Sequence, residues 1–235
     1  MILHFFRGLD FAAAAGSRAS GRWDTGPFYA ADTPVRELGG STVGVVGFGG
    51  VGRAVGVRCG ALGARVLGLR RSLPEPGPRA LETALELPGG RGTVPARVLA
   101  GPEGLAELLA SSDAVVLCVP DTPETRGMVD AAALGRMKPS AVLVNVARGR
   151  VVDENALAEA LEARRLRGAA LDVSAREPLP DDHPLWTLDN VLLTPHVSAV
   201  TDRFWERETA LVVENAARLA AGEPLRNVVD PERGY

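Results

Sequence analysis

The spacing of apolar residues changes along the chain, and the changes predict where helices and strands lie. Residues 1–15 have helical apolar spacing, and a connection rich in glycine, serine and proline follows over 16–34, carrying Trp23. From Ser41 the apolar strand TVGVVG leads through a glycine turn into a helix over about 51–62. The strand ARVLGLR then completes a strand–helix–strand unit.

Proline and glycine are frequent between residues 74 and 102, and no period holds there beyond a possible helical turn over about 79–87. We interpret this stretch as a surface insertion. Beyond it, short apolar strands such as AVVLCVP, AVLVNVA and GAALDV alternate with amphipathic helices. Such alternation is typical of a parallel sheet covered on both faces, and the sequence therefore predicts an α/β fold with a doubly wound parallel sheet.

A last helix is expected over about 201–221, and it leads into a tail that is too polar to form a core of its own. We therefore divide the chain into a sheet-containing unit over 1–200, with the first helix and its connection, and a second unit over 201–235.

Composition narrows the possible functions. The 235 residues are 46% hydrophobic and 23% charged, as in a folded globular protein. A formal net charge of −3 argues against binding to nucleic acid or anionic membranes, and no apolar stretch is long enough to span a bilayer. Cys59 and Cys118 fit neither a metal site nor a disulfide framework. We expect a cytoplasmic protein that acts on small molecules.

The glycine turn has the pattern G-x-G-x-x-G between a strand and a helix, the context in which it binds dinucleotides. Gly47 would permit the tight turn, Gly49 would let the backbone approach a pyrophosphate, and Gly52 would let helix and strand pack closely. The amides of Gly50 and Val51 would face the phosphates at the positive end of the helix dipole. The turn therefore predicts a Rossmann-type domain that binds NAD(P)(H), the alternative being a purely structural glycine turn.

The end of the second strand bears on the choice between the two nicotinamide cofactors. An acidic residue there would bind the ribose 2′-hydroxyl, whereas this chain has Arg70, Arg71 and Ser72. Guanidinium groups bind phosphate oxygens through paired donors. We therefore predict that NADP(H) is favoured over NAD(H), although the arginines could also be a solvated strand end.

Three residues far apart in the sequence have the chemistry for hydride and proton transfer. His196 could donate and accept a proton near neutral pH, and the carboxylate of Glu177 would stabilise its charged form. Arg148 follows a predicted strand, at the sheet end where such folds bind ligands. His4 and His183 are expected to be structural or solvated, and Asp153 and Glu154 to cap a helix or end a strand.

Several motifs in a fixed order give the chain a family resemblance. They are GRWD, ELGGSTVGVVGFGGVGRAV, SSDAVVLCVPDTPETRGMVD, NVARGRVVDENALAEAL, ALDVSAREPLPDDHPLW and NVLLTPHVSA. In this combination the sequence resembles the D-isomer-specific 2-hydroxyacid dehydrogenases, which include glyoxylate/hydroxypyruvate reductases and phosphoglycerate dehydrogenases.

The resemblance implies roles for residues at matching positions. Arg148 would hold the substrate carboxylate and polarise its 2-oxo group, while Glu177 would pair with the catalytic histidine, His196. Asp172 would contact the nicotinamide carboxamide. The cofactor would also be bordered by Val119, Pro120, Thr122, Val146 and Ala147. The implied substrate is a small 2-oxo or D-2-hydroxy acid, and the implied assembly is a homodimer.

The sequence also departs from the family pattern. Members of the family carry a longer segment ahead of the linking helix, forming most of a substrate domain, and we expect residues 201–235 to pack on it. If half of the substrate cleft is missing, and the sequence is not simply an incomplete gene, the alternative function is a catalytically weak or inactive NAD(P)-binding module.

Overall fold

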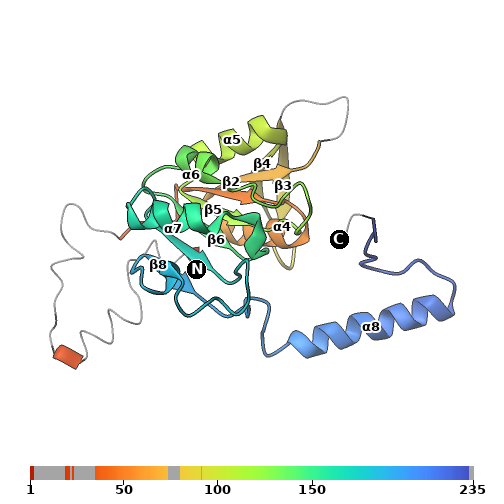
Figure 1. The fold of residues 1–235 in the computed structure, drawn as a ribbon. Coiled ribbons are helices and arrows are strands. Elements are labelled where there is room, and N and C mark those ends of the chain that lie inside the picture. Colours follow the sequence, from red (N-terminus) through yellow and green to blue (C-terminus); the bar gives the residue numbers. More distant parts are fainter. Residues whose placement is uncertain (3–18, 22, 24–34, 74–79, 91, 233–235) are drawn as a thin grey trace.

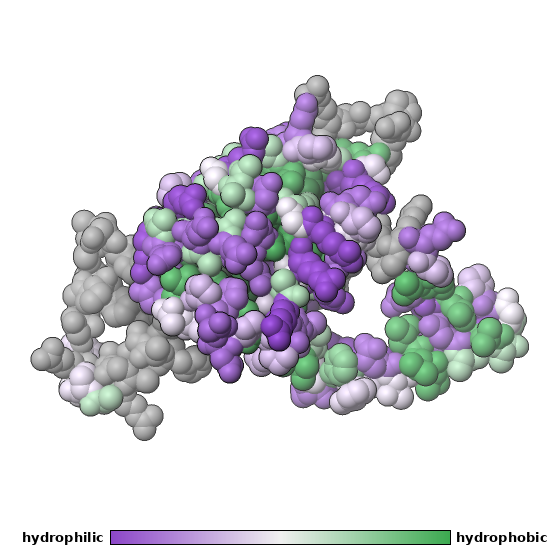
Figure 2. All heavy atoms as spheres, in the orientation of Figure 1, coloured by the Kyte–Doolittle hydropathy of each residue, from purple (hydrophilic) through white to green (hydrophobic). Residues whose placement is uncertain are grey.

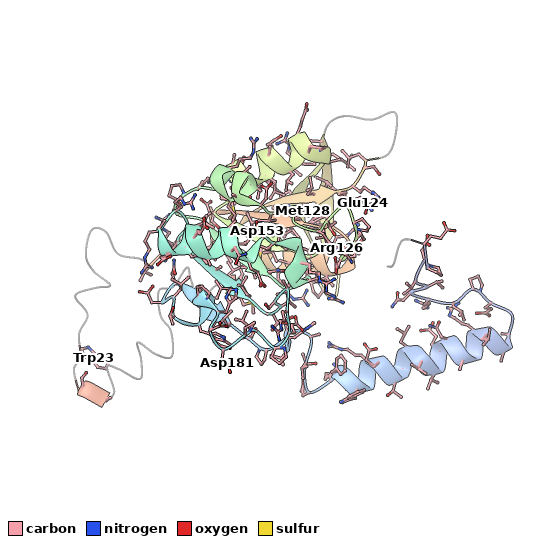
Figure 3. All side chains as sticks on the ribbon, viewed as in Figure 1. Trp23, Glu124, Arg126, Met128, Asp153 and Asp181 are labelled. Atoms are coloured by element: carbon pink, nitrogen blue, oxygen red, sulfur yellow. The ribbon has the colours of Figure 1, made fainter. Side chains whose placement is uncertain are left out.

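The computed structural model describes residues 1–2, 19–21, 23, 35–73, 80–90 and 92–232. The predicted helix over 1–15 and most of the connection that follows it lie outside the described residues. Trp23 is 96% exposed, and Figure 3 shows it away from the sheet.

One sheet of eight strands organises the described chain (Figure 1). Its order is β3-β4-β2-β1-β5-β6-β7-β8, and every neighbouring pair is parallel except β3 with β4. The strands are β1 (Thr42–Val46), β2 (Arg65–Arg70), β3 (Ala80–Glu86), β4 (Thr93–Ala100), β5 (Ala114–Leu117), β6 (Val142–Asn145), β7 (Gly168–Leu171) and β8 (Val191–Leu193). The predicted α/β fold with a doubly wound, mainly parallel sheet is confirmed.

The prediction for residues 74–102 is wrong in its described parts. Instead of an insertion with a helical turn, the chain forms two antiparallel strands, β3 and β4, and β4 pairs in parallel with β2. Leu85 on β3 and Val94, Ala96 and Val98 on β4 are buried in a core cluster. The sequence ALETALE favours a helix by intrinsic propensity, but strand pairing and burial of these side chains override that preference.

Helices cover both faces of the sheet, as the alternation of elements predicts. Helices α5 (Gly101–Ser111), α6 (Ala131–Arg136) and α7 (Glu154–Glu162) contribute to one core cluster, and α4 (Gly50–Ala61) to the other. The central strands β1, β5, β6 and β7 are buried along their whole length. The carboxyl ends of β1 and β5 lie side by side where the strand order reverses, which is where ligands bind in open α/β sheets.

Helix α8 (Phe204–Ala220) differs from the other helices because none of its residues is buried. It extends away from the sheet (Figure 1), and Figure 2 shows hydrophobic residues gathered along it. The exposed apolar residues include Trp205, Val212, Val213 and Leu219. Within the described part of the chain, no helix is long and apolar enough to cross a membrane.

Candidate active site

The glycine turn after β1 is fixed by its own backbone. Gly47 has φ of 94°, and the amides of Gly47 and Phe48 both donate to the carbonyl of Leu69 at the end of β2. A methyl group at Gly52 would lie 2.1 Å from the carbonyl oxygen of Gly47. Gly47 and Gly52 therefore allow a turn and a helix–strand approach that a side chain would prevent.

Gly49 and Gly50, in the same turn, are not close to other atoms in this way. A methyl group at Gly49 or Gly50 would meet no atom within 4 Å. Gly49 is the N-cap of α4 and supplies no side-chain hydrogen bond to it, and the first turn of α4 has no acidic residue. Open space beside uncapped helix amides fits a pyrophosphate group, because the amides and the helix dipole both attract negative charge.

The two arginines at the end of β2 differ in their surroundings. Arg71 forms an exposed ion pair with Glu124, with 3.3 Å between Nη2 and Oε1. Arg70 is also exposed, and within the described ranges no ion pair or hydrogen bond is found for its guanidinium. Ser72 is exposed beside them. Arg70 can therefore turn toward a bound anion without breaking an ion pair, whereas Arg71 would have to leave Glu124.

The loop after β5 forms the other border of the glycine turn. A methyl group at Gly47 would lie 2.8 Å from Cγ1 of Val119, so the two loops are in direct contact. Thr125 donates its hydroxyl to the carbonyl of Pro120 and accepts from the amide of Thr122. Val119, Pro120 and Thr122 are the residues expected here from the sequence. Thr125, which fixes the shape of this loop, was not expected.

The turn after β6 carries Arg148. Asn145 at the end of the strand accepts the amide hydrogen of Ala147 and donates to the carbonyl of Arg148, both at 3.0 Å. Val146 is half-buried and Ala147 is buried, whereas Arg148 is exposed. Asn145 thus holds the backbone of this turn, a role that the sequence analysis did not assign.

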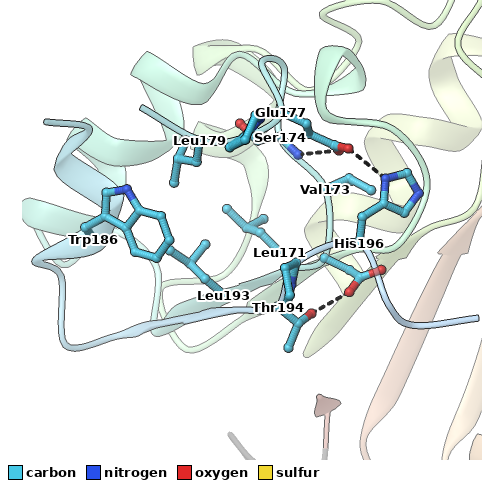
Figure 4. Close-up of a pocket in the computed structure, with 12 residues that line it drawn as sticks. Leu171, Val173, Ser174, Glu177, Leu179, Trp186, Leu193, Thr194 and His196 are labelled. Atoms are coloured by element: carbon cyan, nitrogen blue, oxygen red, sulfur yellow. Dashed lines mark hydrogen bonds and ion pairs between the residues drawn. The ribbon is translucent and has the colours of Figure 1, made fainter. Parts of the chain in front are cut away.

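His196 and Glu177 are joined by a hydrogen bond of 2.8 Å between Nδ1 and Oε2 (Figure 4). Their side chains are 49% and 41% exposed. The other carboxylate oxygen of Glu177 accepts the amide hydrogen of Ser174. The hydrogen bond from His196 lowers the pKa of Glu177, with further contributions from the Ser174 amide and the positive charge of Arg148. Arg148 is thus close enough to act electrostatically on the pair.

Asp172 holds the loop on which His196 lies. It is 1% exposed, and its carboxylate accepts hydrogen bonds from the Thr194 hydroxyl and the amides of Val197 and Ser198. Burial alone would raise the pKa of Asp172, but these hydrogen bonds outweigh it and lower the pKa. The carbonyl of Asp172 also accepts the amide hydrogen of His196, whose φ of 53° is unusual for a residue with a side chain.

A cavity of about 570 Å³ is lined by His196 and Glu177 and by apolar residues that include Leu171, Leu179, Trp186 and Leu193. In Figure 4 the second ring nitrogen of His196, Nε2, points away from these apolar side chains. The free nitrogen is therefore directed to the other side of the pair.

Glu154 is placed differently from the expectation. Asp153 caps α7 as predicted, because its carboxylate accepts from the amides of Asn155 and Ala156. Glu154 instead binds the loop after β7, where its carboxylate accepts from the Ala175 amide at 2.7 Å and the Ser174 hydroxyl at 3.2 Å. In the described part of the chain, no cluster of three or more potential ligands could hold a metal ion.

Fold and turn together define a dinucleotide-binding α/β domain, and comparison with known proteins identifies its family. Residues 1–87 and 92–198 match the family model described as "D-isomer specific 2-hydroxyacid dehydrogenase, NAD binding domain". The chain belongs to the D-isomer-specific 2-hydroxyacid dehydrogenases.

Curated relatives and solved structures agree with this assignment. The chain is 35% identical over 217 residues to D-3-phosphoglycerate dehydrogenase of Methanocaldococcus jannaschii, covering 92% of this chain and 37% of that protein. It is 35% identical over 219 residues to glycerate dehydrogenase of Methylorubrum extorquens, covering 92% of this chain and 62% of the relative. The chain thus spans less than two thirds of either relative.

Two solved structures carry nicotinamide cofactors. A D-isomer specific 2-hydroxyacid dehydrogenase from Xanthobacter autotrophicus Py2, in complex with NADPH and MES, has a TM-score of 0.78 at 36% identity, covering 100% of this chain and 85% of that chain. The second is an NADPH-dependent glyoxylate/hydroxypyruvate reductase from Sinorhizobium meliloti, in complex with NADP and sulfate. It has a TM-score of 0.77 at 29% identity, and the match covers 100% of this chain and 66% of that chain.

Proposed function

We propose that this chain supplies the cofactor-binding and proton-transfer parts of a dehydrogenase that interconverts a small 2-oxo acid and the corresponding D-2-hydroxy acid. The observation that carries the proposal is the 2.8 Å hydrogen bond between His196 Nδ1 and Glu177 Oε2. A histidine held in this way by a carboxylate presents its other nitrogen to a substrate in a defined orientation.

A reduced nicotinamide, when bound, would supply the hydride that C2 of the 2-oxo acid accepts in the direction of reduction. His196 gives the proton on Nε2 to the carbonyl oxygen, so that hydride and proton together yield the 2-hydroxy acid. Glu177 stabilises the imidazolium before the transfer and keeps Nδ1 protonated after it. In the direction of oxidation, the neutral Nε2 accepts the hydroxyl proton.

Arg148 would bind the substrate and stabilise charge on its reacting oxygen. Arg148 is an exposed residue, and its positive charge contributes to lowering the pKa of Glu177. Two parallel hydrogen bonds to the substrate carboxylate would fix the face presented to the cofactor. A lysine would bind the carboxylate less specifically, because it lacks the planar pair of donors.

The proposed cofactor site is built from the glycine turn and the loops around it. The amides of Gly50 and Val51 would bind the pyrophosphate, and Val119, Pro120, Thr122, Val146 and Ala147 would border the dinucleotide. Asp172 would accept a hydrogen bond from the nicotinamide carboxamide, in addition to those from its own loop. The open space at Gly49 and Gly50 supports this placement.

We further propose that NADP(H) is favoured, with Arg70 as the main ligand of the 2′-phosphate and Arg71 and Ser72 as its neighbours. Arg71 would first have to leave Glu124, which makes Arg70 the stronger candidate. Arg70→Asp should raise KM for NADPH and lower it for NADH. If the ratio of the two values stays unchanged, Arg70 is not a phosphate ligand.

The substrates to be tested are glyoxylate, hydroxypyruvate and related short 2-oxo acids. Oxidation of NADPH and NADH by the 235-residue chain is followed with each acid, and His196→Gln should lower turnover about 10²- to 10⁴-fold. His183→Gln, a histidine outside the pair, is the matched control. Cofactor binding without turnover on any acid would select the alternative function, an NAD(P)-binding module.

We also propose that residues 201–235 belong to a second structural unit, because α8 buries none of its residues. A homodimer in the cytoplasm remains part of the proposal, with residues 1–15 and the connection carrying Trp23 as the contact. Light scattering on the wild-type chain and on a Trp23→Ala variant tests the dimer, and cell fractionation tests the location.

A further inference from the structure

Glu154 lies in the first turn of α7, but its carboxylate does not cap that helix. Asp153 already accepts from the free amides of α7, so a second capping carboxylate is not needed there. Glu154 is half-buried and directs both carboxylate oxygens to residues 174 and 175. The side chain therefore ties α7 to the loop after β7.

The peptide that Glu154 holds is also the one against which the Arg148 turn packs. A methyl group at Gly149 would lie 1.8 Å from the carbonyl carbon of Ser174 and 2.1 Å from the amide nitrogen of Ala175. Gly149 is buried, whereas Ala175 is exposed. One carboxylate thus fastens an exposed loop onto the turn that carries Arg148.

The same loop leads directly to Glu177. The amide of Ser174 donates to one carboxylate oxygen of Glu177 at 3.1 Å, and the other oxygen bonds His196 at 2.8 Å. Displacement of Ser174 would remove one of the two bonds that orient Glu177. Contacts therefore continue without a break from Glu154 through Ser174 and Glu177 to His196.

We propose that Glu154 is a positioning residue, which sets the Glu177–His196 pair in place relative to Arg148 by holding the Ser174–Ala175 peptide. The expected effect of Glu154 on turnover rests on the proposed function. Its expected effect on the orientation of Glu177 does not. Glu154 does not touch the reacting groups; it acts through the loop.

The test measures Glu177 itself, by NMR titration of carbon-13-labelled glutamate side chains, with Glu177→Gln assigning the signal. The groups that face the Glu177 carboxylate are His196, the Ser174 amide and the charge of Arg148. In Glu154→Ala the pKa of Glu177 should move up toward its ordinary value of 4.5, because its bonds to Ser174 and His196 weaken. Glu154→Gln keeps an acceptor oxygen for the Ala175 amide and should restore most of the wild-type titration.

Glu159→Ala is the matched control, since it removes an exposed carboxylate from the same helix. It should leave the titration of Glu177 unchanged. An unchanged Glu177 titration in folded Glu154→Ala overturns the proposal, as does an equal shift in Glu159→Ala. Should Glu154→Ala fail to fold, Glu154→Asp decides, because its shorter side chain cannot keep both bonds to residues 174 and 175. A pKa of Glu177 that moves up toward its ordinary value supports the proposal, and a wild-type titration overturns it.

Kinetics add a second measurement. Glu154→Ala should lower kcat about 10- to 100-fold, as expected for a displaced proton donor, with KM for the cofactor unchanged. If the wild-type chain turns over no 2-oxo acid, the proposed function fails while the titration still decides the role of Glu154. A loss of cofactor affinity equal to the loss of kcat would contradict positioning at the proton-transfer pair.

Discussion

The cofactor turn and the proton-transfer pair lie at the same end of the sheet but are held in place by different forces. Around Gly47 and Gly52 the geometry is steric, because added methyl groups would run into backbone atoms. Around Glu177 and His196 it is electrostatic, because exposed side chains are oriented by hydrogen bonds.

Because of this difference, mutations in the two regions should have different effects on the free energy of unfolding. Close packing contributes to the free energy of unfolding, whereas an exposed ion pair contributes little to it. We therefore expect changes at Gly47 and Gly52 to affect folding, and changes in the pair to affect chemistry without affecting folding. The predictions below are ordered by their expected effect on the free energy of unfolding.

The largest effect is expected from Gly52→Ala. Its methyl group would lie 2.1 Å from the Gly47 carbonyl oxygen, and backbone atoms must move to accept it. Stability should fall by about 3 kcal/mol, the upper part of the range for overpacking. Chemical denaturation measures this, and a loss under 1 kcal/mol would show that the turn is not sterically fixed.

A smaller effect is expected from Asp172→Asn, which exchanges an acceptor for a donor facing the amide of Ser198. Stability should fall by about 2 kcal/mol, because the side chain at position 172 is buried and the Ser198 amide would lose its acceptor there. The lowered pKa of Asp172 means that its stabilising contribution is present above its ordinary value of 3.8 and is lost as pH falls below it. Denaturation at pH 7 and at pH 3 should thus show a smaller difference between variant and wild type at the lower pH.

Glu177→Gln should change stability by less than about 1 kcal/mol, since the pair is exposed. Turnover should nevertheless fall, because the imidazolium of His196 loses its negative partner. Thermal unfolding and steady-state kinetics on the same preparation test both parts. A drop in stability as large as that of Gly52→Ala would remove the distinction between the two regions.

The smallest effect on folding is expected from Gly49→Ala, where the added methyl group would meet nothing within 4 Å. The φ of −91° at Gly49 suits any residue. Cofactor affinity should fall about tenfold or more, because the methyl group would occupy the approach of the pyrophosphate. Calorimetric titration with NADPH measures it; unchanged affinity would place the cofactor elsewhere.

What the sequence predicts well is what depends on local pattern. The apolar runs predicted β1, β5, β6 and β7, and the glycine spacing predicted the turn after β1, because these elements follow from neighbouring residues. The strand β3 was missed because ALETALE favours a helix locally, and only pairing with β4 makes it a strand. Long-range contacts therefore decided that segment.

In the candidate site, too, some features could be predicted from the sequence, and others depend on long-range contacts. The pairing of His196 with Glu177 was expected from the family resemblance, and the cap at Asp153 from its position before a helix. The contact of Glu154 with residues 174 and 175 joins positions about twenty apart, and no local pattern indicates it. The same is true of the three bonds to the Asp172 carboxylate, which come from the strand end and loop beyond β8.

The two borders of the sheet limit how the protein could aggregate. One border, β3, runs antiparallel to its neighbour and exposes the carboxylates of Glu82 and Glu86, while the other, β8, has only three residues. Negative charge and short length both discourage a strand of another molecule from joining the ladder. Concentrated solutions should therefore resist fibril formation through these edges, and any lasting association between copies would have to run through helices or loops.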